Sequence, residues 1–189
     1  FLDTAEIASV LQQLNVHERN GAVTAQQLSV NSKVPFGYNY VDNNLYLTHD
    51  EDYQSEHGSH VAGIAAANRY IPQGGGFVDA ASAVKVVGNA PDAQLLVMKV
   101  FGVNGGAYDS DFMAAIEDAI ILGCDSVNLS LGSPNPGMAT NSIYQKLLDS
   151  FEKTDTVVVM SAGNAGNWAE NSMTNNGHLY AEDVSLDTV

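Results

Sequence analysis

Apolar residues recur at helical spacing near the N-terminus. Residues 3–16 carry four of them three or four positions apart, which predicts one amphipathic helix: Ile7, Val10, Leu11 and Leu14. Asn20-Gly21 predicts a break, and Thr24 has the side chain to cap a second short helix in which Leu28 faces inward. The chain therefore begins with helices.

Strand and helix patterns alternate after this region. The first strand pattern alternates apolar and polar residues and tolerates Pro35 near its start, whereas the later ones are apolar on both faces. Such alternation indicates βαβ units and an α/β fold, a three-layer parallel sheet flanked by helices. The expected strands are 34–41, 94–100, 126–132 and 156–164, and the expected helices are 57–68, 109–122 and 141–153.

The helix predicted at 57–68 consists almost entirely of small and apolar residues, so we expect it to be buried on most sides. An acidic, polar surface loop, residues 42–56, leads into it. Gly74-Gly75-Gly76 predicts a flexible loop without a phosphate-binding motif, and residues 88–93 predict a turn.

Composition excludes several classes of function. A length of 189 residues suits one domain with a substantial core. A net charge of −15 with only seven Lys and Arg disfavours nucleic acid and anionic membrane surfaces as partners. No apolar run approaches the roughly 20 residues of a membrane span, and no signal peptide is recognisable. The single Cys124 excludes an internal disulfide framework and is expected to be a buried, inert thiol.

The stretch from Glu56 to Ile64 carries the strongest chemical signal. Its two histidines, His57 and His60, suit a tight loop that opens directly into a helix and presents one imidazole to a cleft. A His-x-x-His pair is also typical of metal sites and of capping histidines. A zincin, however, needs Glu after the first His and a second His four residues on, whereas this chain has Gly58 and a spacing of three.

Other candidates follow the predicted strands, where reacting groups gather in parallel sheets. The Asn164 amide can donate to a developing oxyanion, although asparagine is also a common turn residue. Glycines let a peptide backbone approach closely, although they also punctuate loops. The two glycine-containing segments that would flank an extended groove are Gly105-Gly106-Ala107 and Ser130-Leu131-Gly132.

These segments together resemble the subtilisin-like serine proteases. Residues 57–63 are similar to the family's H-G-T-H-V-A-G motif, with Ser59 in place of Thr. Residues 99–108 look like the strand and loop that line the substrate cleft, 128–132 like the N-x-S-L-G strand, and 161–164 like the oxyanion segment. The resemblance covers residues 57–167 in the family's order.

The resemblance implies peptide-bond hydrolysis by Asp-His-Ser catalysis in a subtilisin-like fold. His57 would be the general base, His60 would support its loop, and Asn164 would stabilise the oxyanion. The backbone of residues 105–107 and 130–132 would pair with an extended protein or peptide substrate. No cofactor is required for this chemistry.

The family's aspartate and serine motifs are missing. Leu2-Asp3-Thr4 lacks the glycine that follows the aspartate, and Asn171-Ser172-Met173 lacks the glycine and proline around the serine. We therefore expect an incomplete catalytic domain whose remainder lies in a parent protease, and a chain that is inactive alone. Its parts would be a lead-in at 1–56, a core at 57–167 and a trailing segment at 168–189.

Finer expectations follow from the region before His57, which resembles the bacterial cell-envelope branch containing lactocepin and the C5a peptidases. That likeness implies an extracellular or cell-envelope location. A structural calcium site is left unassigned, because the acidic candidates are more often solvated faces: Asp42, Asp50, Glu51, Asp52 and Asp79.

Two other functions fit parts of the sequence. A non-catalytic subtilase-fold binding module would share the fold, but retention of His57 and Asn164 disfavours it. A nucleotide-binding α/β domain lacks the expected G-x-G-x-x-G or G-K-[ST] after a strand. Exposed sheet edges would also allow copies of the chain to pair as a homo-oligomer.

Overall fold

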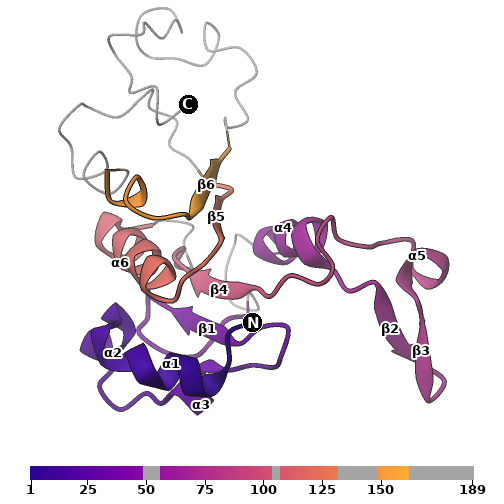
Figure 1. The fold of residues 1–189 in the computed structure, drawn as a ribbon, viewed down its shortest axis with the longest axis horizontal. Coiled ribbons are helices and arrows are strands. Elements are labelled where there is room, and N and C mark those ends of the chain that lie inside the picture. The colour runs from indigo at the N-terminus through magenta and orange to yellow at the C-terminus, as the bar shows by residue number, and fades with distance from the viewer. Residues whose placement is uncertain (49–55, 104–106, 132–148, 162–189) are drawn as a thin grey trace, which may run out of the picture. The chain divides into compact units, whose positions relative to one another are not determined.

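The computed structural model describes residues 1–48, 56–103, 107–131 and 149–161 (Figure 1). The chain divides into two compact units, Phe1–Leu122 and Gly123–Val189. Within the described residues, no helix combines the length and apolar composition needed to cross a bilayer.

The N-terminal helical region is more broken than the periodicity predicts. It contains α1 (Thr4–Val10), the 3-10 helix η1 (Leu11–Gln13), α2 (Asn15–Arg19) and α3 (Ala25–Leu28). The single helix predicted over 3–16 is wrong because Leu14 is extended and the Asn15 N–H donates to the Asp118 carboxylate at 2.6 Å. A partner distant in sequence thus starts a new helix. The predicted Thr24 cap is confirmed, since its hydroxyl accepts the Gln27 N–H.

Parallel strand pairing in the first unit joins β1 (Phe36–Asn39) to β4 (Leu96–Lys99), with Phe36 opposite Leu96. All four residues of β1 are buried, although its pattern alternates. The N-terminal helices and α6 (Asp109–Ile121) supply much of the surrounding core (Figure 1). The buried cluster comprises Ile7, Leu14, Val16, Val23, Ala25, Leu28, Phe36, Tyr38, Tyr40, Ala114, Ala115 and Leu122.

The helix α4 (His57–Ala66) departs from expectation. Only Ala66 among its residues is buried, so the prediction of a helix covered on most sides is wrong for the described residues. Side chains added at Gly58 or Gly63 would meet nothing within 4 Å. Small, apolar composition permits close packing, but no other described element packs closely over most of this helix.

A hairpin and a short helix follow α4. Strands β2 (Tyr70–Gln73) and β3 (Gly76–Asp79) pair antiparallel, and α5 (Ala80–Ala83) follows. The loop predicted at 74–76 is instead the hairpin's two-residue turn: Gly74 and Gly75 have φ of 61° and 84°, as a type I′ turn requires. The predicted turn at 88–93 returns the chain to the end of α4, where the Gly88 N–H donates to the Ala67 carbonyl at 2.9 Å.

In the second unit, β5 (Ser126–Leu129) pairs parallel with β6 (Val157–Met160). β6 is not buried on both faces as its apolar run predicts, because Val157 and Val159 are 59% and 51% exposed. Residues 149–151 are helical, while most of the helix predicted at 141–153 lies outside the described residues. The parallel pairing and the helices in both units agree with the predicted α/β class.

Candidate active site

His57 is the first residue of α4, and both His57 and His60 are exposed. The helix begins without a side-chain cap, and the first turn is closed by the His60 N–H, which donates to the Glu56 carbonyl at 2.8 Å. Within the residues that the structure describes, neither imidazole has a hydrogen-bond partner. The start of a helix at His57 agrees with the prediction, whereas the cleft that its imidazole would face stays a prediction.

The expected cleft segment after β4 is described only in part. Ala107 and Tyr108 are exposed, whereas Gly105 and Gly106 lie outside the described residues. Tyr108 precedes α6, and its carbonyl accepts the Asp111 and Phe112 N–H groups at 3.0 and 3.1 Å. The end of this segment is thus fixed by the start of α6.

The segment after β5 shows how strand pairing joins two predicted site elements. The Asn128 amide donates to the Ser130 hydroxyl at 2.9 Å. Ser161 donates its N–H to the Leu129 carbonyl at 3.2 Å and its hydroxyl to the Leu131 carbonyl at 3.1 Å. Ser130 and Leu131 thus lie beside the first residue of the predicted oxyanion segment.

Two members of the predicted site, Gly132 and Asn164, lie outside the described residues. The expectation that His57 and Asn164 face one cleft stays a prediction. The Ser161 contact was missed by sequence reasoning, although the parallel register of two adjacent apolar strands is the signal that indicates it.

Asp3 and Ser172 are the residues most similar to the family's missing aspartate and serine. The Asp3 carboxylate caps α1, accepting the Ala5 and Glu6 N–H groups at 2.8 and 2.9 Å, while the Glu6 carboxylate accepts the Asp3 N–H. Its oxygens therefore have a structural role. Ser172 lies outside the described residues.

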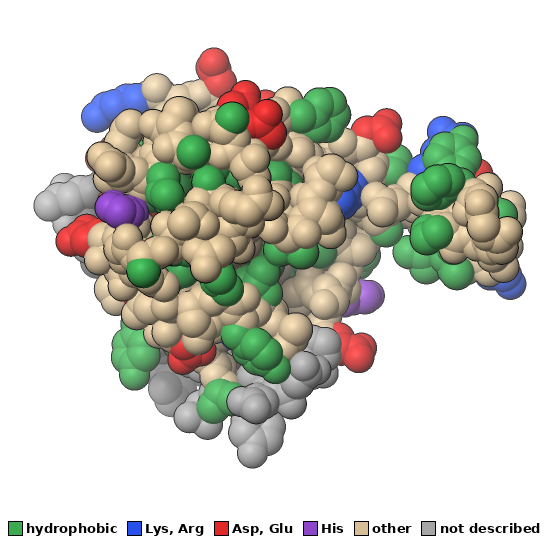
Figure 2. Space-filling model, turned by 90° about the horizontal axis from the view of Figure 1, so that it is seen from below, with side chains coloured by type: hydrophobic (Ala, Val, Ile, Leu, Met, Phe, Trp, Pro, Cys, Tyr) green, Lys and Arg blue, Asp and Glu red, His purple; other side chains and the backbone are tan. Residues whose placement is uncertain are grey.

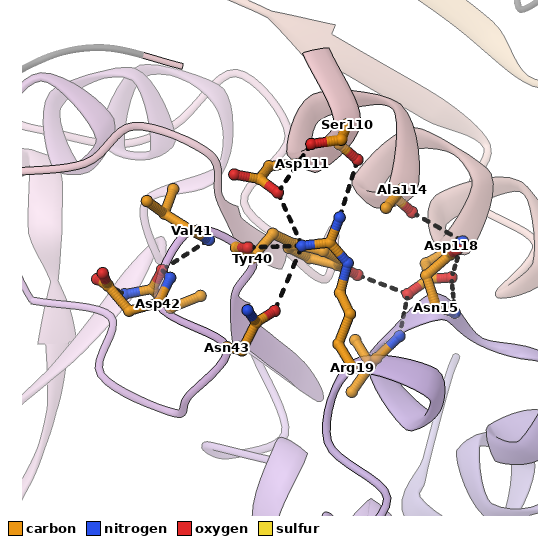
Figure 3. Close-up of polar contacts among 12 residues, drawn as sticks. Asn15, Arg19, Tyr40, Val41, Asp42, Asn43, Ser110, Asp111, Ala114 and Asp118 are labelled. Atoms are coloured by element: carbon orange, nitrogen blue, oxygen red, sulfur yellow. Dashed lines mark hydrogen bonds and ion pairs between the residues drawn. The ribbon is translucent and has the colours of Figure 1, made fainter. Parts of the chain in front are cut away.

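A polar network between the N-terminal helices and α6 was not predicted (Figure 3). Asp118 is fully buried on α6, and its carboxylate accepts the Val16 N–H at 3.1 Å and the Tyr40 hydroxyl at 2.8 Å, besides the Asn15 N–H. Burial raises the pKa of the Asp118 carboxyl, opposed by these hydrogen bonds. Burial also raises the pKa of the Tyr40 hydroxyl, and the Asp118 charge adds to that effect.

Arg19 extends the same network at the other end of α2. Its guanidinium donates to the Tyr40 carbonyl and to the Asp111 carboxylate, both at 2.8 Å, and to the Ser110 carbonyl at 2.9 Å. Donors and acceptors are matched within the fold, and none of these residues belongs to the segments that resemble the family's site. We therefore assign this cluster to docking of the N-terminal helices rather than to catalysis.

Other acidic residues and the cysteine were also candidates for chemistry. Asp42 accepts from the Asn39 amide at 3.0 Å, and Asp79 caps α5. Among the described residues no group of three or more His, Cys, Asp or Glu side chains is arranged to hold a metal ion. Cys124 is only half-buried, so the expectation of a buried thiol is wrong. Its partial burial and the neighbouring Asp125 charge nevertheless raise the pKa of the thiol to about 11, which disfavours the thiolate.

Comparisons with known proteins identify the relatives of this chain. The model of the Subtilase family matches residues 21–185. The PI-type proteinase of Lactococcus lactis subsp. cremoris is 42% identical over 139 residues, covering 72% of this chain and 7% of that protein. The minor extracellular protease Vpr of Bacillus subtilis (strain 168) is 36% identical over 137 residues, 69% of this chain and 15% of Vpr.

Subtilisin E of Bacillus subtilis (strain 168) is 32% identical over 136 residues, which is 71% of this chain and 31% of subtilisin E. The chain therefore spans a small part of the length of each of these relatives. Since the family model matches most of the sequence, including the histidine motif that opens α4, this chain belongs to the subtilase family.

Proposed function

We propose that this chain is part of the catalytic domain of a secreted or cell-envelope bacterial serine endopeptidase. The observation that carries the proposal is the motif His57-Gly58-Ser59-His60, which opens α4 with an exposed imidazole inside the region that the Subtilase family model matches. The extracellular location rests on likeness to relatives such as the minor extracellular protease Vpr.

In the proposed reaction, His57 takes the proton from a serine hydroxyl as that oxygen attacks the scissile carbonyl. The Asn164 amide donates to the oxyanion of the tetrahedral intermediate. His57 then gives its proton to the leaving amine, and water releases the acyl group in a second, equivalent cycle. Residues 105–107 and 130–132 hold the substrate backbone by strand pairing.

The contacts at the end of β5 support the assignment of residues 130–132 to substrate binding. Ser161 fixes the Leu131 carbonyl, so that segment has a defined position next to the predicted oxyanion segment. A substrate strand needs such a fixed partner, because each backbone hydrogen bond requires a donor and an acceptor at strand spacing.

We further propose that the 189 residues alone are inactive, since they contain neither the family's aspartate motif nor its serine motif. The proposal is tested in a chimera in which this chain replaces the matching segment of the PI-type proteinase, which would supply the other groups. We expect the chimera to cleave a fluorogenic peptide, and His57→Ala to abolish cleavage.

The control is His60→Ala, for which we expect partial loss, because its proposed role is to support the loop. A soluble, folded chimera that binds substrate peptides without cleaving them would instead favour the non-catalytic binding module. Pairing of copies through strand edges is tested separately by light scattering of the 189-residue chain, where a monomeric mass at high concentration contradicts it.

A further inference from the structure

The hairpin that follows α4 has two different faces. In the antiparallel register Tyr70 lies opposite Asp79 and Pro72 opposite Phe77, which places these four side chains on one face. Phe77 is 76% exposed and Tyr70 is 56% exposed. The face with Tyr70, Pro72 and Phe77 is therefore a largely exposed aromatic surface.

The two outer edges of the hairpin also differ. In a hairpin with a two-residue turn, hydrogen-bonded and non-hydrogen-bonded pairs alternate from the turn, so the backbone groups of Pro72 and Phe77 point outward. The Ala80 N–H, which donates to the Arg69 carbonyl at 2.8 Å, confirms this alternation at the base. Pro72 has no N–H, so β2 cannot donate there.

The outer edge of β3 does offer a complete pair. Within the described part of the chain, the outward N–H and C=O of Phe77 have no hydrogen-bond partner. An edge of this kind readily accepts an additional strand. The hairpin thus offers a donor and an acceptor at Phe77 on the β3 side, whereas the β2 side lacks a donor at Pro72.

Charge distinguishes the hairpin from the rest of the molecule. Two of only seven Lys and Arg in this chain of net charge −15 flank it: Arg69 immediately precedes β2, and Lys85 follows α5, with its N–H donating to the Ala80 carbonyl at 2.9 Å. Both are exposed and neither forms an ion pair with a described residue, while the Arg69 guanidinium lies 5.7 Å from the centre of the Tyr70 ring. Figure 2 shows Lys and Arg side chains beside hydrophobic ones on the part of the chain that contains the hairpin and α5.

Asp79 is the acidic residue of the hairpin, and its carboxylate caps α5, accepting the Ala81 N–H at 2.8 Å. Arg69 and Lys85 outnumber this one carboxylate, so residues 69–85 carry a net charge of +1. The complementary ligand is an extended segment that carries carboxylates together with apolar side chains.

The hairpin is also tied to the helix that carries His57. The Gly88 and Ala90 N–H groups donate to the Ala67 and Ala65 carbonyls at 2.9 and 2.8 Å, so the chain leaves and rejoins the C-terminal end of α4. The ten residues of α4 span about 15 Å. An extended chain covers that distance with about five residues.

We propose that the β2–β3 hairpin is a substrate-binding exosite, at which the outer edge of β3 takes up an acidic, apolar segment of the protein substrate as a third strand. This inference rests on the proposed function for the identity of its ligand. The bound segment lies at least about five residues from the scissile bond, given the length of α4.

The test measures binding by the 189-residue chain, so it does not depend on catalysis. The probe is a fluorescein-labelled decapeptide of alternating glutamate and valine, followed by fluorescence anisotropy, with alternating lysine and valine as the charge-reversed comparison. At 0.15 M NaCl the Debye length of about 8 Å screens most of the remote negative charges of the chain, and we expect the glutamate peptide to bind at least about tenfold more tightly. We expect this preference to shrink in 0.5 M NaCl.

Matched substitutions locate the site. Phe77→Ser is expected to weaken binding about fivefold, whereas Phe1→Ser, at a residue that is 95% exposed, leaves it unchanged. Lys85→Glu is expected to weaken binding about fivefold, whereas Lys153→Glu makes the same charge change in the other unit without effect. Equal effects within either pair would overturn the proposal.

Amide hydrogen exchange tests strand addition itself. Saturating peptide is expected to slow exchange of the Phe77 N–H about tenfold or more, because that group becomes hydrogen-bonded. Unchanged exchange at Phe77 would overturn strand addition. Equal binding of both peptides would also overturn the proposal. So would self-association of the chain that blocks peptide binding and is removed by Phe77→Ser, because the edge of β3 would then bind a second copy of the chain.

The experiments distinguish a failure of the exosite proposal from a failure of the proposed protease function. If the chimera cleaves short peptides but the chain binds neither decapeptide, the exosite is wrong and the protease assignment stands. If the chain binds the glutamate peptide through Phe77 but the chimera is folded and inactive, the hairpin is a binding site of a non-catalytic protein.

Discussion

The N-terminal helices and α4 differ in how their sequences relate to burial. Residues 1–20 lie outside the match to the family model, yet Ile7, Leu14 and Val16 there are at most 2% exposed. α4 carries the family's histidine motif and is richer in small and apolar residues, yet Ala66 is its one buried residue. Burial therefore follows from which elements pack together and not from the apolar content of a helix.

The polar contacts of the two regions differ in the same way. The N-terminal helices are joined to α6 by Asp118 and Arg19, which satisfy backbone groups at the start of α2 and near the end of β1. α4 is joined to its surroundings mainly through its own C-terminal carbonyls. The N-terminal helices are thus an integral part of the first unit, while the side chains at the N-terminal end of α4 are exposed.

Removal of the Asp118 carboxylate is expected to have the largest effect. Asp118→Ala leaves the Asn15 and Val16 N–H groups and the Tyr40 hydroxyl without their acceptor in a buried site, which lowers the free energy of unfolding by about 3 kcal/mol. Urea unfolding followed by circular dichroism measures the change. The control is the exposed Asp92→Ala, for which we expect no measurable loss; equal losses would show that Asp118 does not hold the N-terminal helices.

Gly88→Ala tests the connection at the other end of α4. A Cβ at position 88 would lie 2.5 Å from the Ala66 carbonyl carbon and 2.6 Å from its Cα, and these backbone atoms cannot move without disturbing the helix end. We expect a loss of about 2 kcal/mol in the free energy of unfolding. The same urea experiment measures it, and an unchanged midpoint would contradict the close approach that ties the hairpin to α4.

Local sequence signals predicted much of this arrangement. Thr24 predicted the start of α3, the apolar runs predicted the paired strands, and Asn20-Gly21 predicted the break after α2, since each depends on neighbouring residues. The histidine motif predicted a helix that begins at His57, and α4 does begin there. The relation of His57 to Asn164 was also proposed from the sequence and stays a prediction.

Long-range contacts account for most of what the sequence did not predict. The interruption at Leu14 depends on Asp118, about a hundred residues away, and periodicity within residues 3–16 contains no information about that acceptor. The exposure of α4 likewise depends on what packs against it. The hairpin turn is an exception, because Gly74-Gly75 is a local signal for a type I′ turn that was taken only as a loop.

The pH dependence of stability sharpens the comparison at Asp118. Burial raises the pKa of its carboxyl in the folded chain, so the folded state favours the protonated form more than the unfolded state does. Its contribution to stability is therefore full below the unfolded pKa and is lost as the pH rises through the raised, folded pKa. We expect the stability of the wild-type chain relative to Asp118→Asn to fall as the pH rises above about 4. A relative stability that rises with pH over that range would instead show that the hydrogen bonds to the ionised form dominate.

The smallest change in the free energy of unfolding is expected for Gly63→Ala. The sign of this change distinguishes an exposed α4 from one that is packed against another element. A Cβ at this position would meet nothing within 4 Å, so Gly63→Ala should raise the free energy of unfolding through helix propensity, by about 0.5–1 kcal/mol. If α4 were packed against another element at this face, as its composition predicted, the added methyl would instead overlap that element and destabilise the chain. Urea unfolding of Gly63→Ala beside Gly88→Ala makes the distinction, because both variants add one methyl group to a glycine, at Gly63 in open space on α4 and at Gly88 against the Ala66 backbone.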